Sequence, residues 1–431
     1  MYIHIIRDLQ SRKERKKKRK MELGSFFRPA AVVLSLVLVQ LLEAQALNQN
    51  RSRVVPALLV FGDSLVDPGN NNVLPTVARS NFPPYGRDFV GHKATGRFSN
   101  GKIATDVIVS ELGIKEYLPA YLDPELKPQD LLTGVSFGSA GTGYDTLTAT
   151  TFVSSFPFSH MLHFLYFFTL KKMTPRAARL NQNCYILWSV LQFSKVVKVL
   201  FQSVLSIWDQ LELFMEYKEK LKAIAGEGRA ARIISESLYI VCAGNNDVVI
   251  TYFGPTSPYR KMQYDFSSYA SFLVQTASSF LEELYHLGAR RIGVLGLPPL
   301  GCLPSQRTMA GGKQRECVAS FNEASKEYNS KLYKELKMLG TKLPGTKMVY
   351  IDFYTPAYEI FHDPIKYGFE QASTGCCGTG IFEYAILCND LSPHTCTDTS
   401  KYVFFDSYHP TQRVYEIFLP KAFQEYLPHL I

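Results

Sequence analysis

Three side chains of the sequence have the types and local settings that nucleophilic catalysis requires. Ser64 comes after the apolar run 54–61 and a Gly-Asp pair, so a sharp turn can present its hydroxyl to a cleft. Far along the chain, Asp406 stands three residues before His409. A short loop of this kind can aim His409 at a serine as general base while Asp406 fixes its tautomer. Each motif alone is more often an ordinary turn or helix cap, so the prediction of a serine hydrolase depends on their conjunction.

A serine nucleophile also needs hydrogen-bond donors for the negative charge that develops on the substrate oxygen. Gly141 lies in the glycine-rich run 139–143 and can offer an unobstructed backbone N–H. Asn246 follows an apolar run and can offer a side-chain amide. Gly141 and Asn246 are therefore candidate oxyanion donors, against the plainer interpretation of a glycine turn and an Asx-turn.

A second serine competes for the role of nucleophile. Residues 134–138 read Gly-Val-Ser-Phe-Gly, which matches the nucleophile-elbow pattern of the α/β-hydrolases. Such an elbow must follow a strand and open into a helix, whereas residues 139–142 predict a glycine-rich loop. We therefore interpret Ser136 as a loop residue and Ser64 as the nucleophile.

The segments around these residues predict an α/β fold. Four apolar runs are typical of buried strands: 54–61, 238–243, 291–295 and 347–353. Three amphipathic stretches predict helices, each followed by a glycine suited to a C-cap: 209–225, 267–287 and 318–339. Alternating strands and helices imply a mostly parallel sheet covered on both faces, and such sheets bind ligands beyond the C-terminal ends of their strands.

The charge distribution argues against a nucleic-acid partner. The 431 residues, 46% of them apolar, can bury a large single core. The formal net charge is +9, but residues 1–20 hold nine Lys and Arg and residues 151–201 hold six, so the rest of the chain is net acidic. A nucleic-acid site needs positive charge spread over a folded face beside aromatic side chains. We therefore expect no nucleic-acid binding.

The N-terminal region predicts a secreted protein. Residues 21–46 have the pattern of a signal peptide, with an apolar stretch that ends at Ala44-Gln45-Ala46, a small-x-small cleavage pattern. Residues 1–20 would then be a basic extension ahead of a start at Met21, and an uncleaved membrane anchor is the alternative. The mature chain is expected to be a single domain over residues 47–431.

The cysteines point to the same compartment. Six of the eight lie in turn-rich sequence, as disulfides would require: Cys302, Cys317, Cys376, Cys377, Cys388 and Cys396. Their pairing is not readable from the sequence. A zinc site is the rival interpretation, but neither the spacing nor a nearby His-x-x-x-His supports it. Asn50-Arg51-Ser52 is a glycosylation sequon, as expected of a secreted protein.

Residues 152–201 disagree with their surroundings. The stretch is rich in aromatic and basic residues, contains no acidic residue, and has neither a clear strand period nor a capped helix. Its flanks would join sensibly without it, so we interpret it as translated non-coding sequence such as a retained intron. The alternative is a genuine lid or lipid-contacting insertion that makes transient contact with a membrane surface or cell wall.

Together the motifs resemble the plant GDSL esterase/lipase family of the SGNH hydrolases. Its four blocks correspond to Gly62-Asp63-Ser64, Gly141, Gly244-x-Asn246-Asp247 and Asp406-x-x-His409. The match extends through further segments: 70–72, 82–86, 96–101, 375–378 and 402–406. It covers essentially everything from 56 to 427 except residues 152–201. It departs in the second block, which usually reads Gly-x-Asn-x-Ala but here has Ser136 at the asparagine position.

The resemblance implies a three-layer α/β/α sandwich, flavodoxin-like, with a central mainly parallel sheet. It implies that Ser64 forms an acyl-enzyme, that His409 transfers the proton and that Asp406 orients His409. The N–H groups of Ser64 and Gly141 and the Asn246 amide would form the oxyanion hole. The implied substrates are small-molecule, lipid or polymer esters, with no metal or organic cofactor. An acyltransferase and a secreted binding protein that has lost activity are the alternatives on this scaffold.

Overall fold

The computed structural model describes residues 55–151, 203–254, 259–392 and 394–431, which belong to one compact unit. Its strands are β1 (Leu58–Gly62), β2 (Leu238–Cys242), β3 (Arg291–Leu295), β4 (Lys347–Ile351), β5 (Gln371–Gly375) and β6 (Tyr402–Phe404). Its α-helices are α2 (Ala104–Glu111), α3 (Pro128–Leu131), α4 (Thr146–Thr151), α7 (Ile207–Ala225), α8 (Glu227–Glu236), α9 (Tyr259–Gln263), α10 (Phe266–His286), α11 (Pro304–Ala310), α12 (Ala319–Lys342), α13 (Tyr354–His362) and α14 (Gln412–Leu430). A π-helix, η4 (Asp247–Tyr252), follows β2.

Strands β1 to β4 form a parallel sheet in the order β1-β2-β3-β4. The strands pair in register from their first residues, with these four side by side: Leu58, Leu238, Arg291 and Lys347. Every residue of β1 and β2 is buried, as the apolar runs predicted. Because the strands are parallel, their C-terminal ends meet at one edge, where Gly62 and Cys242 lead into the loops that carry polar side chains.

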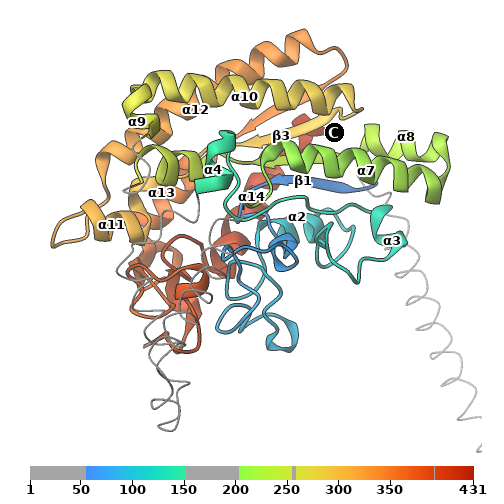
Figure 1. The fold of residues 1–431 in the computed structure, drawn as a ribbon. Helices are drawn as coiled ribbons and strands as arrows, with labels where there is room; N and C mark the ends of the chain where they lie inside the picture. Colours follow the sequence, from blue (N-terminus) through green and yellow to red (C-terminus); the bar gives the residue numbers. More distant parts are fainter. Residues whose placement is uncertain (1–54, 152–202, 255–258, 393) are drawn as a thin grey trace, which may run out of the picture. The chain divides into compact units, whose positions relative to one another are not determined.

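Helices cover both faces of this sheet (Figure 1). Helices α7, α10 and α12 lie on one side, where α12 packs against β4 and α10. Helices α2 and α14 lie on the other, where α14 packs against β3, β4 and α2. This arrangement confirms the predicted three-layer sandwich with a mainly parallel central sheet. β5 and β6 form a small second sheet, in which the two strands are parallel.

Two helix ends differ from their predicted positions by two residues or more. Helix α7 begins at Ile207 instead of 209 because the hydroxyl of Ser206 accepts the N–H of Asp209 at 3.2 Å and caps the first turn. The third predicted helix, 318–339, was expected to stop before Gly340. This prediction is wrong, since α12 continues to Lys342. Pro344, two residues beyond, ends it instead.

Three disulfides close the C-terminal loops: Cys302–Cys317, Cys376–Cys396 and Cys377–Cys388. This pairing uses all six of the predicted cysteines, so the zinc interpretation is wrong. In the described part of the chain, no helix is both long enough and apolar enough to cross a membrane. The predicted signal peptide, the sequon and the segment 152–201 lie outside the described residues.

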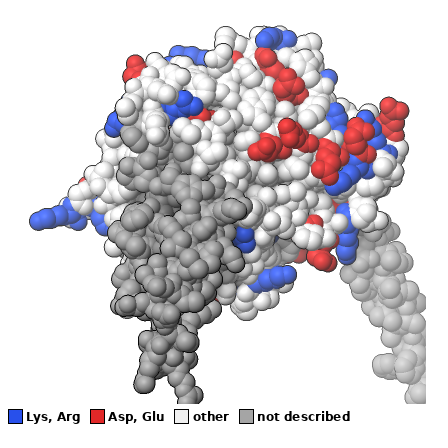
Figure 2. Space-filling view, in the orientation of Figure 1, with Lys and Arg blue, Asp and Glu red and all other residues white. Residues whose placement is uncertain are grey.

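Charged side chains of both signs intermix on the visible surface over α7 and α8 (Figure 2). Neighbouring turns of α7 pair them, with Lys220 2.6 Å from Glu216 and Lys222 2.6 Å from Glu219. Such exposed pairs contribute little stability, but they prevent one sign of charge from gathering on this helix.

The two flanks of the segment 152–201 are joined by hydrogen bonds. The N–H of Val204 donates to the carbonyl of Ala149 at 3.2 Å. The N–H of Leu205 donates to the hydroxyl of Ser139 at 3.2 Å, and its carbonyl accepts the hydroxyl of Thr142 at 2.6 Å. The described fold therefore closes across the segment and uses both flanks to hold the glycine-rich loop.

Deleting residues 152–201 is expected to leave the fold intact, because the flanks already meet and a short connection can join them. Circular dichroism and thermal unfolding of the chain from residue 47, with and without the segment, measure this. The undeleted chain with the same N-terminus is the control. A shortened chain that fails to fold, or that melts more than about 10 °C lower, would assign the segment a structural role.

Candidate active site

Ser64 follows β1 through a turn that requires glycine. Gly62 has φ +139°, and a Cβ atom there would lie 1.9 Å from the carbonyl oxygen of Cys242 on β2. The N–H of Asp63 donates to the same oxygen at 3.0 Å, and its carboxylate accepts the N–H of Leu65 at 3.0 Å. The turn therefore directs Ser64 out of the sheet into a pocket beyond the strand ends.

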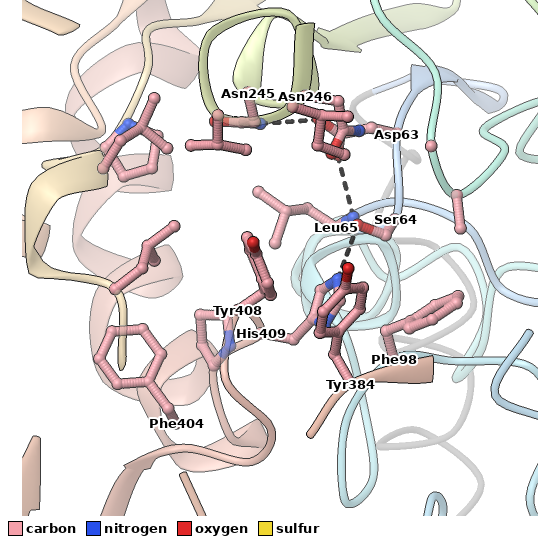
Figure 3. Close-up of a pocket in the computed structure, with 18 of the residues that line it drawn as sticks. Asp63, Ser64, Leu65, Phe98, Asn245, Asn246, Tyr384, Phe404, Tyr408 and His409 are labelled. Atoms are coloured by element: carbon pink, nitrogen blue, oxygen red, sulfur yellow. Dashed lines mark hydrogen bonds between the residues drawn. The ribbon is translucent and has the colours of Figure 1, made fainter. Parts of the chain in front are cut away.

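Ser64, His409 and Asp406 form a continuous hydrogen-bonded chain. His409 Nε2 lies 2.7 Å from Ser64 Oγ (Figure 3). His409 Nδ1 lies 2.8 and 2.7 Å from the two carboxylate oxygens of Asp406. With Nδ1–H donated to Asp406, Nε2 is left to accept a proton from Ser64. The fold thus brings together three residues that separate motifs predicted.

The loop that carries Asp406 and His409 connects β6 to α14. Asp406 Oδ1 accepts the backbone N–H groups of Tyr408 at 2.9 Å and His409 at 2.7 Å. The N–H of Phe405 donates to the carbonyl of His409 at 2.8 Å and closes the loop. Asp406 is fully buried and His409 is 6% exposed. The buried loop therefore holds the carboxylate and the imidazole in a fixed mutual orientation.

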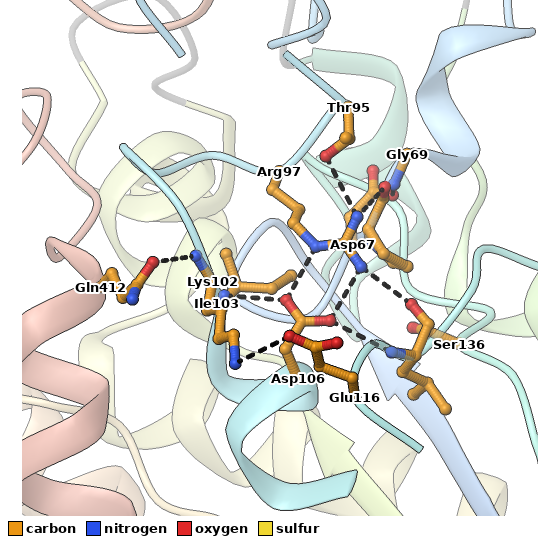
Figure 4. A network of polar contacts seen from close by, with 12 residues as sticks. Asp67, Gly69, Thr95, Arg97, Lys102, Ile103, Asp106, Glu116, Ser136 and Gln412 are labelled. Atoms are coloured by element: carbon orange, nitrogen blue, oxygen red, sulfur yellow. Dashed lines mark hydrogen bonds and ion pairs between the residues drawn. The ribbon is translucent and has the colours of Figure 1, made fainter. Parts of the chain in front are cut away.

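Phe98 packs against His409, with ring centroids 4.8 Å apart. Its neighbour Arg97 anchors this segment through a two-pronged ion pair with Asp106 of α2, at 2.7 and 2.8 Å (Figure 4). Arg97 also donates to the carbonyl of Leu118 at 3.0 Å. The ion pair is buried, and both of its side chains make further hydrogen bonds. It therefore fixes the segment that carries Phe98, which limits rotation of the His409 ring.

Gly141 and Asn246 lie on two loops that line the same pocket as Ser64. The amide nitrogen of Asn246 donates to the carbonyl of Thr142 at 2.9 Å, and its second N–H can serve a ligand. Gly141 has φ +95°, a conformation that favours glycine. The fold therefore places both predicted oxyanion donors on the wall of the pocket that also holds Ser64.

Asp247 joins these two loops. Its carboxylate accepts the N–H groups of Tyr144 at 2.8 Å and Asp145 at 3.0 Å, and the hydroxyl of Thr148 at 2.6 Å. A Cβ atom on Gly143 would lie 2.2 Å from the carboxylate, so glycine permits the close approach. Burial raises the pKa of Asp247 to about 7 despite the hydrogen bond from Thr148. Asp247 belongs to the Gly-x-Asn-Asp motif, but the motif alone did not predict this role.

Asp63 and Asn245 are two further site residues that sequence analysis missed. Asn245 Nδ2 donates to Asp63 Oδ2 at 2.7 Å, which ties the nucleophile turn to the loop after β2 (Figure 3). Asp63 is 1% exposed, and burial raises its pKa to about 6 although the Asn245 hydrogen bond and the charge of His409 oppose the shift. Their positions inside the Gly-Asp-Ser and Gly-Asn-Asn motifs were the available signal.

The buried carboxyl groups predict that stability falls as pH rises toward neutrality. Burial raises the pKa of Asp63 and Asp67 to about 6 and that of Asp247 to about 7, against about 4 in an unfolded chain. The folded protein binds these protons more tightly, so this contribution is full below about pH 4 and is lost as pH rises through about 6 to 7. Urea unfolding between about pH 5 and 8 should show a flatter dependence in Asp247→Asn. An unchanged slope would contradict the raised pKa of Asp247.

Ser136, the competing serine, lies in the core beside β1. It is fully buried, its Oγ donates to the carbonyl of Val66 at 2.6 Å and accepts the N–H of Gly138 at 3.1 Å, and it bridges to Val60. It does not belong to the wall of the pocket, whereas Ser64 does. The fold therefore places Ser64, and not Ser136, beside His409.

The pocket beside Ser64 has a mostly apolar wall. Of the described residues that line it, Asp63 and His409 are the charged types. Leu65, Tyr408 and Phe404 extend the wall away from Ser64 (Figure 3). Further apolar side chains complete it: Val249, Ile250, Leu300, Leu303, Phe353 and Phe361. Among the described residues, no group of three or more His, Cys, Asp or Glu side chains could hold a metal ion.

Replacing Asn246 by alanine is expected to lower kcat about 10²- to 10³-fold, the cost of one oxyanion donor. KM should change little, because the donor acts mainly on the charge of the transition state. Steady-state hydrolysis of p-nitrophenyl butyrate measures both constants. Asn329→Ala is the matched control, since Asn329 is also buried but bonds Leu297 outside the pocket. Unchanged turnover in Asn246→Ala would show that the assigned oxyanion hole is wrong.

Comparison with known proteins agrees with the geometry. Residues 58–419 match the family described as GDSL-like Lipase/Acylhydrolase. The chain is 42% identical over 401 residues to the GDSL esterase/lipase EXL2 of Arabidopsis thaliana, covering 93% of this chain and 96% of that protein. It is 40% identical over 378 residues to the GDSL esterase/lipase EXL3 of the same plant, covering 88% and 89%. The chain therefore belongs to the GDSL family of lipases and acylhydrolases.

Proposed function

We propose that this chain is a secreted serine esterase that hydrolyses carboxylic esters of apolar acids through an acyl-enzyme on Ser64. The observation that carries the proposal is the hydrogen-bonded chain from Ser64 through His409 to Asp406 at the wall of an apolar pocket. Membership in a family of lipases and acylhydrolases supports ester hydrolysis as the reaction class.

In the first half of the reaction, Ser64 Oγ attacks the ester carbonyl carbon while His409 Nε2 takes the hydroxyl proton. The carbonyl oxygen becomes an oxyanion, which accepts hydrogen bonds from the N–H groups of Ser64 and Gly141 and from the Asn246 amide. Protonated His409 then gives its proton to the alcohol oxygen as the carbon–oxygen bond breaks. The alcohol leaves and the acyl group stays on Ser64.

In the second half, water attacks the acyl carbonyl while His409 takes one of its protons. The oxyanion forms again at the same donors, and its collapse expels Ser64 Oγ, which regains its proton from His409. The products are a carboxylic acid and the free enzyme. An alcohol in place of this water would make the chain an acyltransferase, so the acid product distinguishes the two reactions.

The pocket supports an apolar acyl group. Among the residues that the structure describes, the wall carries only Asp63 and His409 as charged residue types, and both belong to the catalytic edge. An anionic acid would lack a cationic partner there, whereas a hydrocarbon chain would replace water along Leu65, Leu300 and Leu303. Each buried CH₂ contributes about 0.8 kcal/mol, or up to about fourfold in kcat/KM.

Three disulfides support secretion, because such bonds persist in oxidising compartments. The proposal further takes residues 21–46 as a signal peptide that is removed. Sequencing the N-terminus of the mature protein tests this part directly. An intact N-terminus beginning at residue 1 or 21 would contradict it.

The activity is tested with p-nitrophenyl acetate, butyrate, octanoate and laurate and with a fluorophosphonate probe. We expect hydrolysis of all four, a kcat/KM that rises from acetate to octanoate, and covalent labelling of Ser64. Equal kcat/KM across the series would overturn the assignment of an apolar acyl site. A folded chain that hydrolyses none of the esters and takes no label would favour a binding protein instead.

A further inference from the structure

Ser64, His409 and Asp406 form the triad of the proposed mechanism, and the Asp406 carboxylate has a hydrogen-bond partner beyond His409. The hydroxyl of Tyr85 lies 2.6 Å from Asp406 Oδ2, across 321 positions of sequence. Oδ1 accepts two N–H groups of its own loop, from Tyr408 and His409, so local backbone fixes that oxygen. Oδ2 is reached by Tyr85 and by His409 Nδ1, at 2.7 Å. Fixing the plane of a carboxylate requires donors at both oxygens, and Tyr85 supplies the donor at Oδ2 that does not belong to His409 itself.

Tyr85 is itself held in one orientation. It is 1% exposed, and its ring lies among three aromatic rings at centroid distances of 5.4 to 5.9 Å: Phe82, Phe98 and Phe405. Its oxygen accepts the N–H of Ala385 at 2.9 Å, which leaves the hydroxyl proton to point at Asp406. Burial and the Asp406 carboxylate raise the pKa of Tyr85 well above its ordinary value, so it remains a donor at working pH.

The partner of Tyr85 also belongs to the disulfide-closed loop. Ala385 lies between Cys377 and Cys388, which are bonded to each other. The N–H of Cys377 donates at 2.7 Å to the carbonyl of Phe405, the residue before Asp406. One covalently closed loop therefore supports both the tyrosine and the carboxylate.

We propose that Tyr85 is a positioning residue of the active site, which fixes the plane of the Asp406 carboxylate and tunes the charge that it presents to His409. The proposal rests on the proposed serine mechanism. Tyr85 does not line the pocket, so its effect reaches the substrate only through Asp406 and His409.

The test is the pH dependence of p-nitrophenyl butyrate hydrolysis by Tyr85→Phe. The variant keeps the ring, and we expect kcat to fall about tenfold with KM unchanged within about twofold. Without the hydroxyl, Asp406 retains more negative charge and holds protonated His409 more firmly. The acid limb of the profile, which is the fall of kcat/KM toward low pH, should therefore move to higher pH.

Tyr217→Phe is the matched control. Tyr217 is also fully buried, and its hydroxyl donates to the carbonyl of Leu131 at 2.6 Å, away from the triad. We expect a similar loss of stability in the control but a native kcat and a native pH profile. Equal effects of the two substitutions on kcat and on the acid limb would overturn the proposal.

A second substitution keeps the test decisive where Tyr85→Phe does not fold. Placing 3-fluorotyrosine at position 85 retains the packing and makes the phenol a stronger donor, so the acid limb should move to lower pH. A shift of the fall in kcat/KM to higher pH, or no shift, would overturn the role of Tyr85. Hydrolysis that survives Ser64→Ala would instead overturn the serine mechanism on which the inference rests.

Discussion

Ser64→Ala is expected to reduce the hydrolysis of p-nitrophenyl esters about 10⁴-fold or more. Ser64 Oγ is the atom that would become acylated. His409 Nε2 lies 2.7 Å from it and is the atom that would accept its proton. A methyl group there can neither attack the carbonyl nor pass a proton to His409. The residual rate would come from binding and from the oxyanion donors alone.

The measurement is kcat/KM with p-nitrophenyl octanoate, together with fluorophosphonate labelling located by peptide mass spectrometry. Ser136→Ala is the matched control, because it removes a buried serine hydroxyl from the neighbouring segment without touching the pocket. We expect the control to keep its activity and to lose about 1–3 kcal/mol of stability, since its Oγ makes two buried hydrogen bonds. Loss of labelling in Ser136→Ala and not in Ser64→Ala would reverse the assignment of the nucleophile.

The layers of the fold were predictable because they depend on short-range patterns. An apolar run such as 291–295 cannot face water on either side, so it predicts a strand covered by helices, and β3 has these bounds. The end of α12 was not predictable in this way. Gly340 looks like a C-cap from local sequence, but it does not adopt the positive φ of a C-cap glycine, so the helix passes through it and ends at Lys342, before Pro344.

The site was predictable where chemistry requires a particular residue type in a recognisable setting. Ser64, Asp406 and His409 carry reactive groups within short motifs, and the fold brings them within hydrogen-bonding distance. The role of Tyr85 was not predictable, because a tyrosine in an aromatic segment usually packs in a core. The role proposed for its hydroxyl depends on Asp406, which lies 321 positions away in the sequence. Long-range hydrogen bonds of this kind have no periodic signature in sequence.

In the proposed mechanism the charge of Asp406 is the second strong determinant of activity, and Asp406→Asn is expected to reduce kcat about 10⁴-fold. The amide must place its oxygen at the Oδ1 position, where the N–H groups of Tyr408 and His409 require an acceptor. Its NH₂ group then occupies the Oδ2 position, 2.7 Å from His409 Nδ1, and donates a hydrogen bond to that nitrogen, while the Tyr85 hydroxyl, 2.6 Å from the same position, has to turn and accept the second N–H. His409 would be held with its proton on Nε2, the nitrogen that has to accept the proton of Ser64.

This loss should occur without unfolding, since asparagine has nearly the same shape and keeps the backbone hydrogen bonds of the loop. The measurement is therefore kcat beside the near-ultraviolet circular dichroism and thermal midpoint of the same preparation. Fluorophosphonate labelling of Ser64 should slow in parallel, because it needs the same proton transfer. A folded Asp406→Asn enzyme with turnover within about tenfold of the native value would contradict tautomer control by Asp406, because His409 would then accept the serine proton without a carboxylate to direct it.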